Sequence, residues 1–138
     1  MTQPRITLVT LTALDVAALT GFYERLGWVA AHKLPETSFF DLKGFKFGIY
    51  NRAMMAKDLG RPDDSLRSGA MALAQNFVSK AEVDAAYKAA IAAGATVCKE
   101  PEDVFWGGYS GTWADPEGHI WEYAFNPFWD LDEDGYIA

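Results

Sequence analysis

One pattern of secondary structure occurs twice along the chain, and this repeat restricts the fold more than any other feature. In each half, a β-like stretch precedes a helical stretch that ends at a glycine, and three further β-like stretches follow. Gly27 corresponds to Gly94 at an offset of 67 residues, and Gly44 corresponds to Gly118 at an offset of 74. Each βαβββ unit leaves one apolar sheet face that it cannot bury alone. We therefore expect the two repeats to pack together.

The first repeat extends over about residues 5–51. Residues 5–12 are rich in β-branched types, which favour a strand. Asp15 is a candidate N-cap for a helix whose apolar side chains recur at helical spacing until Gly27. Three β-like stretches follow, at residues 28–33, 37–42 and 45–51. The last two are close enough in sequence to form a hairpin around Gly44.

The second repeat extends over about residues 70–126, after a connector at residues 52–69. Ser79 and Glu82 form a capping-box pattern that predicts the start of a helix, and Gly94 predicts its end. The predicted strands are residues 70–78, 95–100, 108–115 and 119–126. A loop carrying Pro101 is predicted to follow the second of them.

Length and composition favour a single α+β domain. With 138 residues, half of them hydrophobic, the chain can bury about two-thirds of its unfolded surface in one core. We predict one domain over residues 1–138, in which the two βαβββ repeats form curved mixed sheets around a shared cleft. Residues 127–138 are predicted to form an acidic tail.

Charge and cysteine content exclude several classes of protein. The 12 Lys and Arg residues against 19 Asp and Glu residues give a formal charge of −7, which repels phosphate backbones and argues against nucleic acid. No segment approaches the roughly 20 apolar residues of a membrane span, and the N-terminus lacks a signal-peptide pattern, so we expect a cytoplasmic protein without membrane association. Cys98 is the only cysteine, which excludes an internal disulfide and a cysteine zinc site.

Two motifs make the chain similar to a known superfamily. The sequence FYERLGW at residues 22–28 ends the first helix, and DPEGHIWE at residues 115–122 forms the last hairpin. In this order and at this separation, they resemble the vicinal oxygen chelate superfamily of glyoxalases, bleomycin resistance proteins and dioxygenases. FWGGYSG at residues 105–111 is similar to its glyoxalase-like branch. The resemblance covers nearly the whole chain and implies a homodimer.

The resemblance also implies where a metal site would lie. In metal-dependent relatives, ligands from the first and last strands of each repeat hold a divalent ion that acts as a Lewis acid. The corresponding positions here are Leu8, either Leu73 or Gln75, Gly48 and Glu122. Only Glu122 can be an ionic ligand, which leaves too few donors to retain a hard divalent ion. We therefore predict a cleft with no metal and no other cofactor.

Glu122 is the candidate catalytic residue, because the resemblance places it in the cleft, where a carboxylate can act as a general acid or base. A structural hydrogen bond to Gln75 or Thr10 explains Glu122 equally well, and both interpretations stay open. Aromatic walls supply the apolar contact that ligand pockets need, although core packing also accounts for Trp113. The predicted ligand-binding residues are Thr10, Gln75, Trp106, Tyr109 and Trp113.

Three functional hypotheses follow from these observations. The first is a protein that binds a small hydrophobic or aromatic molecule in a metal-free cleft. The second is a lyase or isomerase of the glyoxalase kind, with Glu122 as acid, base or metal ligand. The third is an interaction domain whose cleft is filled by its own side chains. Whether the chain is an enzyme is left open by the sequence.

Overall fold

The polypeptide folds as two units, and the chain passes from one to the other between Ser68 and Gly69. The structure is a computed structural model that describes residues 2–138. Each unit contains one curved four-stranded mixed sheet that is not closed into a barrel. The predicted repeats, at about 5–51 and 70–126, fall one in each unit, and the predicted α+β class is confirmed.

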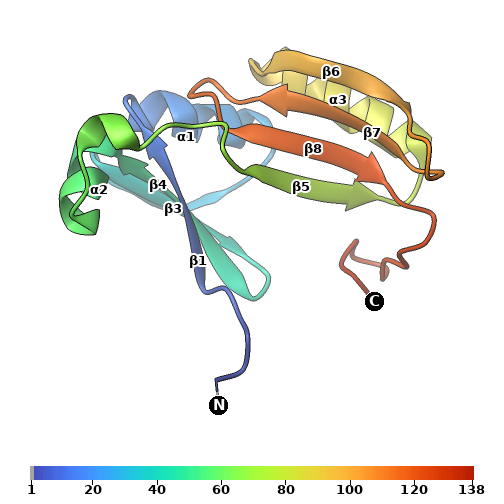
Figure 1. Ribbon diagram of the computed structural model, residues 1–138, viewed down its shortest axis with the longest axis horizontal. Helices are drawn as coiled ribbons and strands as arrows, with labels where there is room; N and C mark the ends of the chain where they lie inside the picture. The colour runs from blue at the N-terminus through green and yellow to red at the C-terminus, as the bar shows by residue number, and fades with distance from the viewer. Residues whose placement is uncertain (1) are drawn as a thin grey trace. The chain divides into compact units, whose positions relative to one another are not determined.

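The first unit follows the predicted order of strand, helix and three strands. Its elements are β1 (Leu8–Ala13), α1 (Val16–Arg25), β2 (Ala30–Lys33), β3 (Thr37–Leu42), β4 (Phe45–Asn51), α2 (Arg52–Leu59) and the 3-10 turn η1 (Asp63–Ser65). The strand order is β1-β4-β3-β2, with β1 parallel to β4 and the other pairs antiparallel (Figure 1). The unit therefore places its first and last strands side by side.

Helix α1 covers one face of this sheet and forms the core of the first unit with it. The side chain of Asp15 accepts a hydrogen bond from the Ala18 backbone N–H at 3.0 Å, which caps the helix as predicted. Leu19 and Phe22 are fully buried beneath the helix. Burial of each such side chain stabilises the fold by about 1.5–3 kcal/mol. Since strand residues alternate between faces, the other sheet face is left without α1.

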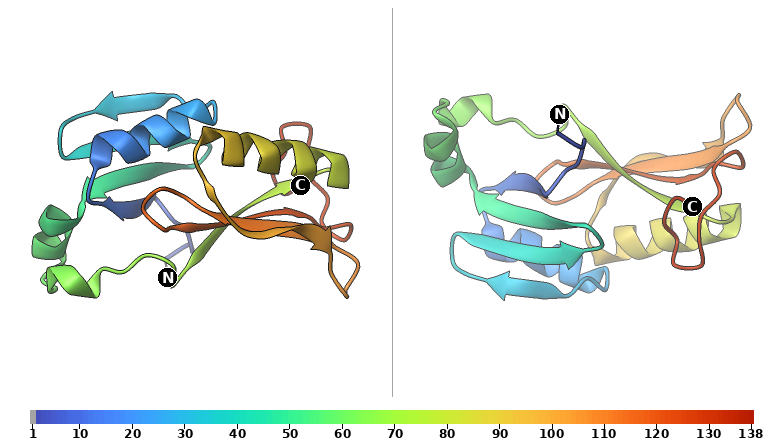
Figure 2. Two further views of the ribbon diagram at one scale, coloured as in Figure 1. Left: turned by 90° about the horizontal axis from the view of Figure 1, so that it is seen from above. Right: turned by 90° about the horizontal axis from the view of Figure 1, so that it is seen from below.

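The second unit repeats the arrangement. Its elements are β5 (Ala72–Phe77), α3 (Lys80–Ala93), β6 (Thr96–Asp103), β7 (Tyr109–Ala114) and β8 (Ile120–Phe125). The strand order is β5-β8-β7-β6, with β5 parallel to β8. Figure 2 shows α3 lying along one face of this twisted sheet. The first and last strands of this repeat are again neighbours.

Helix α3 begins with the predicted capping box, in a slightly shifted form. Ser79 Oγ accepts from the Glu82 backbone N–H at 3.1 Å. The Glu82 carboxylate accepts from the backbone N–H of Val78, one residue before the N-cap, at 3.1 Å. Gly94 ends the helix with a positive φ of 122°, a backbone conformation that favours glycine.

The predicted loop at Pro101 is wrong, because β6 continues through this residue to Asp103. The ladder shifts register between Lys99 and Glu102, so that two residues of β6 oppose Gly111 of β7. Such a bulge accommodates proline, which has no N–H to donate to the neighbouring strand. The strand predicted at residues 95–100 ends too early because the sequence pattern does not reveal the bulge at Pro101.

The predicted absence of a membrane-spanning helix agrees with the structure. Among the helices of residues 2–138, none combines the length and the apolar character needed to cross a bilayer.

Candidate functional site

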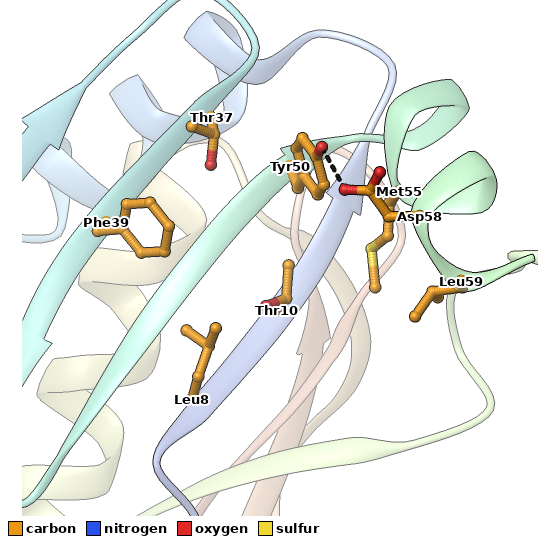
Figure 3. Close-up of a pocket in the computed structure, with 8 residues that line it drawn as sticks. All are labelled: Leu8, Thr10, Thr37, Phe39, Tyr50, Met55, Asp58 and Leu59. Carbon is orange, nitrogen blue, oxygen red and sulfur yellow. Dashed lines mark hydrogen bonds between the residues drawn. The ribbon is translucent and has the colours of Figure 1, made fainter.

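The face of the first sheet that α1 does not cover contains a hollow of about 350 Å³. Its wall is mostly apolar, and polar groups lie at a few points (Figure 3). The lining residues are Leu8, Thr10, Thr37, Phe39, Tyr50, Met55, Asp58 and Leu59. We call it the α2 hollow, because the last three of these residues belong to α2. All eight belong to the first unit.

Strand alternation explains why the sheet residues of the α2 hollow share one face. Thr10 of β1 is paired with Gly48 of β4, and Gly48 is paired with Phe39 of β3. Directly paired residues on adjacent strands project from the same face of a sheet. Phe47 and Ile49, one residue to either side, are buried beneath α1 instead. One face is thus the core, and the other is the floor of the hollow.

Two lining residues of the α2 hollow, Phe39 and Leu8, pack closely against Gly48. A Cβ atom at this position would lie 3.2 Å from Phe39 Cε1 and 3.4 Å from Leu8 Cδ1. These distances are tight, so the absence of a side chain lets the ring and the leucine approach the backbone. Gly48 occupies the predicted metal-ligand position of the first repeat, and a glycine offers no side-chain donor there.

Helix α2 forms one side of the α2 hollow, and both of its ends are fixed. The side chain of Asn51 accepts a hydrogen bond from the Met54 N–H at 3.1 Å, and Gly60 ends the helix with a φ of 68°. Met55 and Leu59 lie one helical turn apart and so project from the same side. Figure 3 shows both side chains directed toward the hollow.

A hydrogen bond joins the sheet to α2 at the wall of the hollow. The Tyr50 hydroxyl donates to Asp58 Oδ2 at 2.7 Å (Figure 3). The bond to Asp58 raises the pKa of Tyr50 above its ordinary value of 10.0, and the negative charges of Asp58 and Glu36 act in the same direction. Tyr50 therefore stays a neutral donor at physiological pH.

Glu122 lies on the sheet face of the second unit that faces away from α3. It is paired with Ala74 of β5 and Thr112 of β7, and its side chain is half-buried. Within its own unit, over residues 69–138, no hydrogen bond engages the Glu122 carboxylate. Gly44 and Gly118 both have a positive φ. Gly48 lies four residues after Gly44, and Glu122 lies four residues after Gly118. The predicted equivalence of Glu122 and Gly48 is consistent with this geometry.

The expectation that Gln75 shares a face with Glu122 is wrong. Gln75 is paired with Tyr123, which is buried on the α3 side, so Gln75 and Leu73 project from the opposite face to Glu122. The sequence left the register of β5 uncertain by a few residues, and a shift of one residue reverses the face. Ala74 takes the place beside Glu122.

The donor set does not fit the metal that the superfamily resemblance implies. In the first unit, the open face offers Leu8, Thr10 and Gly48 at the corresponding positions, and in the second unit it offers Ala74 and Glu122. One carboxylate cannot hold a hard divalent ion by itself. Within residues 2–138, no group of three or more His, Cys, Asp or Glu side chains could hold a metal ion.

The three aromatic residues of the predicted ligand set are not gathered at one place. Trp113 is fully buried and stacks on Trp121 with ring centroids 5.7 Å apart, beneath α3. The hydroxyl of Tyr109 donates to Asp84 of α3 at 2.7 Å. Trp106 is 43% exposed and its ring lies over Gly108 of its own loop. A role for these residues in ligand binding stays a prediction.

Of the predicted ligand-binding residues, Thr10 alone lines the α2 hollow. The other lining residues were missed, although strand alternation in residues 37–42 and 45–51 carried the signal for Thr37, Phe39 and Tyr50. No sequence pattern indicated the lining residues of α2, which are Met55, Asp58 and Leu59. Only the tertiary structure places this part of the connector beside the sheet.

A repeated βαβββ unit defines a class of α+β proteins in which the first and last strands of each repeat are paired and the helix leaves one sheet face uncovered. A sequence model of the Glyoxalase/Bleomycin resistance protein/Dioxygenase superfamily matches residues 5–123. The chain belongs to this superfamily. The predicted resemblance is thereby confirmed.

Solved structures share the fold. A glyoxalase-related enzyme from Fulvimarina pelagi is 34% identical with a TM-score of 0.90, and the match covers 99% of this chain and 98% of that chain. A lactoylglutathione lyase from Agrobacterium tumefaciens is 22% identical with a TM-score of 0.70, covering 95% and 100%. At this lower identity the likeness concerns the fold. No curated protein matches the chain by sequence.

Proposed function

We propose that this protein binds a small, largely apolar molecule without a metal, and that the α2 hollow is part of the binding site. The observation that carries the proposal is the hollow itself. Its volume of about 350 Å³ lies at the lower end of the roughly 300–1,000 Å³ that ligand pockets occupy. Apolar walls with a few polar groups are the usual composition of such pockets.

The polar groups of the hollow can orient a ligand by forming hydrogen bonds with it. The Thr37 hydroxyl donates to the Ile49 carbonyl at 2.8 Å, so its oxygen can still accept a hydrogen bond. The Thr10 hydroxyl makes no hydrogen bond to the described part of its unit. A molecule with an apolar body could therefore bury that body on Phe39 and Met55 and direct a polar group toward these hydroxyls.

Binding of a neutral probe tests the proposal. We expect 2-(1-naphthyl)ethanol to bind, with amide chemical-shift changes in β1, β3, β4 and α2. Thr10→Phe fills the hollow and should weaken binding at least about tenfold, which corresponds to about 1.4 kcal/mol. Val29→Phe adds the same ring at a site that is 83% exposed and outside the lining, and should leave binding unchanged. Equal binding by the two variants would contradict the proposal.

A second candidate is a lyase or isomerase of the glyoxalase kind, with Glu122 as the acid or base. Two observations favour it: the Glu122 carboxylate has no hydrogen-bond partner within its unit, and the 34%-identical protein from Fulvimarina pelagi is described as an enzyme. Substitution Glu122→Gln keeps the shape and removes the charge. It should abolish any turnover found with the wild-type protein, whereas unchanged turnover would remove this candidate.

The metal-free proposal has its own measurement. We expect protein purified without chelators to contain far less than one equivalent of zinc, nickel, iron or manganese by elemental analysis. The physical reason is that Glu122 is the one carboxylate at the corresponding positions of β1, β4, β5 and β8. Stoichiometric metal that is lost in Glu122→Gln would overturn this part of the proposal.

We also propose a cytoplasmic homodimer. Strands β1 and β5 are edges of their sheets, and Met54 is 42% exposed. Unpaired edges and exposed apolar side chains are commonly covered by a second copy. A monomeric mass by light scattering at micromolar concentration would contradict the dimer.

A further inference from the structure

We infer that the α2 hollow selects molecules that combine an apolar body with a protonated amine, and that the ammonium group lies beside Asp58. This inference rests on the proposed function and names the class of its ligand. Four properties of the hollow lead to it: its ionised groups, the neighbouring basic residues, the polarity of α2 and the Tyr50 hydrogen bond.

The lining of the hollow carries a single sign of charge. Of its eight residues, Asp58 alone carries a formal charge. The remaining lining residues are apolar or carry hydroxyl groups. An anionic ligand would therefore meet a carboxylate and no compensating cation, whereas an ammonium ion would gain a charge-assisted hydrogen bond.

The nearby basic residues do not reverse this sign. Lys46 lies on the same sheet face but its Nζ is 2.8 Å from Asp41 Oδ1. Arg52, at the start of α2, is paired with Asp63 at 2.6 Å. Lys57 precedes Asp58 in α2 but is exposed and does not line the hollow. Lys46 and Arg52 thus have acidic partners of their own, and Lys57 and Arg61 are exposed and lie outside the lining.

The polarity of α2 favours a cation at the same point. Asp58 and Leu59 are the last two residues of this eight-residue helix. Backbone dipoles give the C-terminal end of a helix a partial negative charge, which attracts cations over about one turn. This contribution adds to the charge of Asp58 and is independent of it.

Tyr50 leaves part of the Asp58 carboxylate available. Its hydroxyl donates to Oδ2, and no second hydrogen bond to the Asp58 side chain is present within residues 2–68. Asp58 and Glu36 raise the pKa of Tyr50, so the hydroxyl remains a donor and fixes the carboxylate. The other oxygen can then accept from an ammonium group whose aromatic body contacts Phe39.

Three ligands that share a 1-naphthyl body test this inference: 2-(1-naphthyl)ethylamine, 2-(1-naphthyl)ethanol and the carboxylate 1-naphthaleneacetate. We expect the amine to bind about tenfold more tightly than the carboxylate at neutral pH and low salt, with the alcohol between them. The preference should decrease as sodium chloride is added, because salt screens exposed charges. Equal affinities for amine and carboxylate, or a preference that salt does not change, would overturn the inference.

A matched pair of variants assigns the preference to one residue. Asp58→Asn keeps the size and the acceptor for Tyr50, and should reduce the preference for the amine to about twofold. Asp64→Asn removes one charge from the same unit outside the lining, and should retain the preference. An unchanged preference in Asp58→Asn would overturn the inference. Alcohol binding without amine preference defeats the inference alone, whereas absence of binding by all three ligands defeats the proposed function as well.

Discussion

Single residues fix several features of this protein through backbone geometry. Gly111 of β7 is the clearest case, because a Cβ atom there would lie 2.8 Å from the Pro101 backbone nitrogen and 2.8 Å from its Cγ. Neither the backbone nor the proline ring can move away easily. The bulge in β6 therefore depends on a glycine in the neighbouring strand.

We predict that Gly111→Ala lowers the free energy of unfolding by about 1–3 kcal/mol, as expected for an overpacked site. Gly21→Ala is the control, because its Cβ atom would meet the flexible end of Arg25 at 3.3 Å within α1. Alanine favours helix more than glycine by up to about 1 kcal/mol, so this variant should be neutral or stabilised. Urea unfolding monitored by circular dichroism measures both. A fully stable Gly111→Ala protein would show that the bulge can relax.

The buried side chain of Tyr123 makes the free energy of unfolding decrease at alkaline pH. Burial raises the pKa of Tyr123 from 10.0 to about 12. An unfolded tyrosine loses its proton at lower pH than the folded one, so this contribution is complete below pH 10 and is lost as pH rises toward 12. The loss attributable to Tyr123 is at most about 3 kcal/mol. Tyr123→Phe should therefore lose less stability than wild type between these pH values, measured by urea unfolding. Parallel curves for the two proteins would contradict the assignment.

At the scale of elements, both long helices depend on a capping residue that the sequence identifies. Ser79 caps α3, whose buried residues Val83, Tyr87 and Ala90 cover the second sheet. Without the cap, the first turn of α3 would expose a backbone N–H that has lost its partner.

We predict that Ser79→Ala costs about 1 kcal/mol and increases amide hydrogen exchange at the start of α3. The matched variant Ser68→Ala lies on an exposed turn before β5 and should change stability by less than about 0.5 kcal/mol. Hydrogen exchange followed by NMR gives both the magnitude and its location. Equal effects of the two variants would indicate that the cap contributes nothing.

On the scale of the whole molecule, charge is divided unequally between the two units. Residues 1–68 contain nine Lys or Arg and seven Asp or Glu residues, whereas residues 69–138 contain three and twelve. The formal charges are therefore +2 and −9, which add to the −7 of the chain. Repulsion within the acidic unit opposes its compact state.

We predict that raising sodium chloride from about 0.02 to 0.3 M stabilises the second unit, because screening weakens repulsion between exposed charges. Four of the five tryptophans belong to this unit, so thermal unfolding followed by tryptophan fluorescence reports mainly on it. We expect the unfolding temperature to rise by a few degrees, about as for a 1 kcal/mol gain. The double variant E100Q/E133Q should respond less to salt. A lower unfolding temperature at high salt would contradict the prediction.

Much of the fold was determined by the sequence alone. Local signals were sufficient where a residue acts on its own neighbours: Asp15 and Ser79 begin helices, and Gly94 ends one. The strands at 37–42 and 45–51 were predicted with the bounds that the structure has. The superfamily followed from two motifs, and the family match confirmed it.

The candidate site depended on tertiary structure. Strand alternation shows which residues share a face only when the register is known. Because the register of β5 was uncertain, Gln75 was predicted on the wrong face. Likewise, residues 52–69 were predicted as a connector, and the position of α2 beside the sheet depends on packing between segments distant in sequence. The bond between Tyr50 and Asp58, and with it the hollow, exists because α2 folds back beside the open face of the sheet.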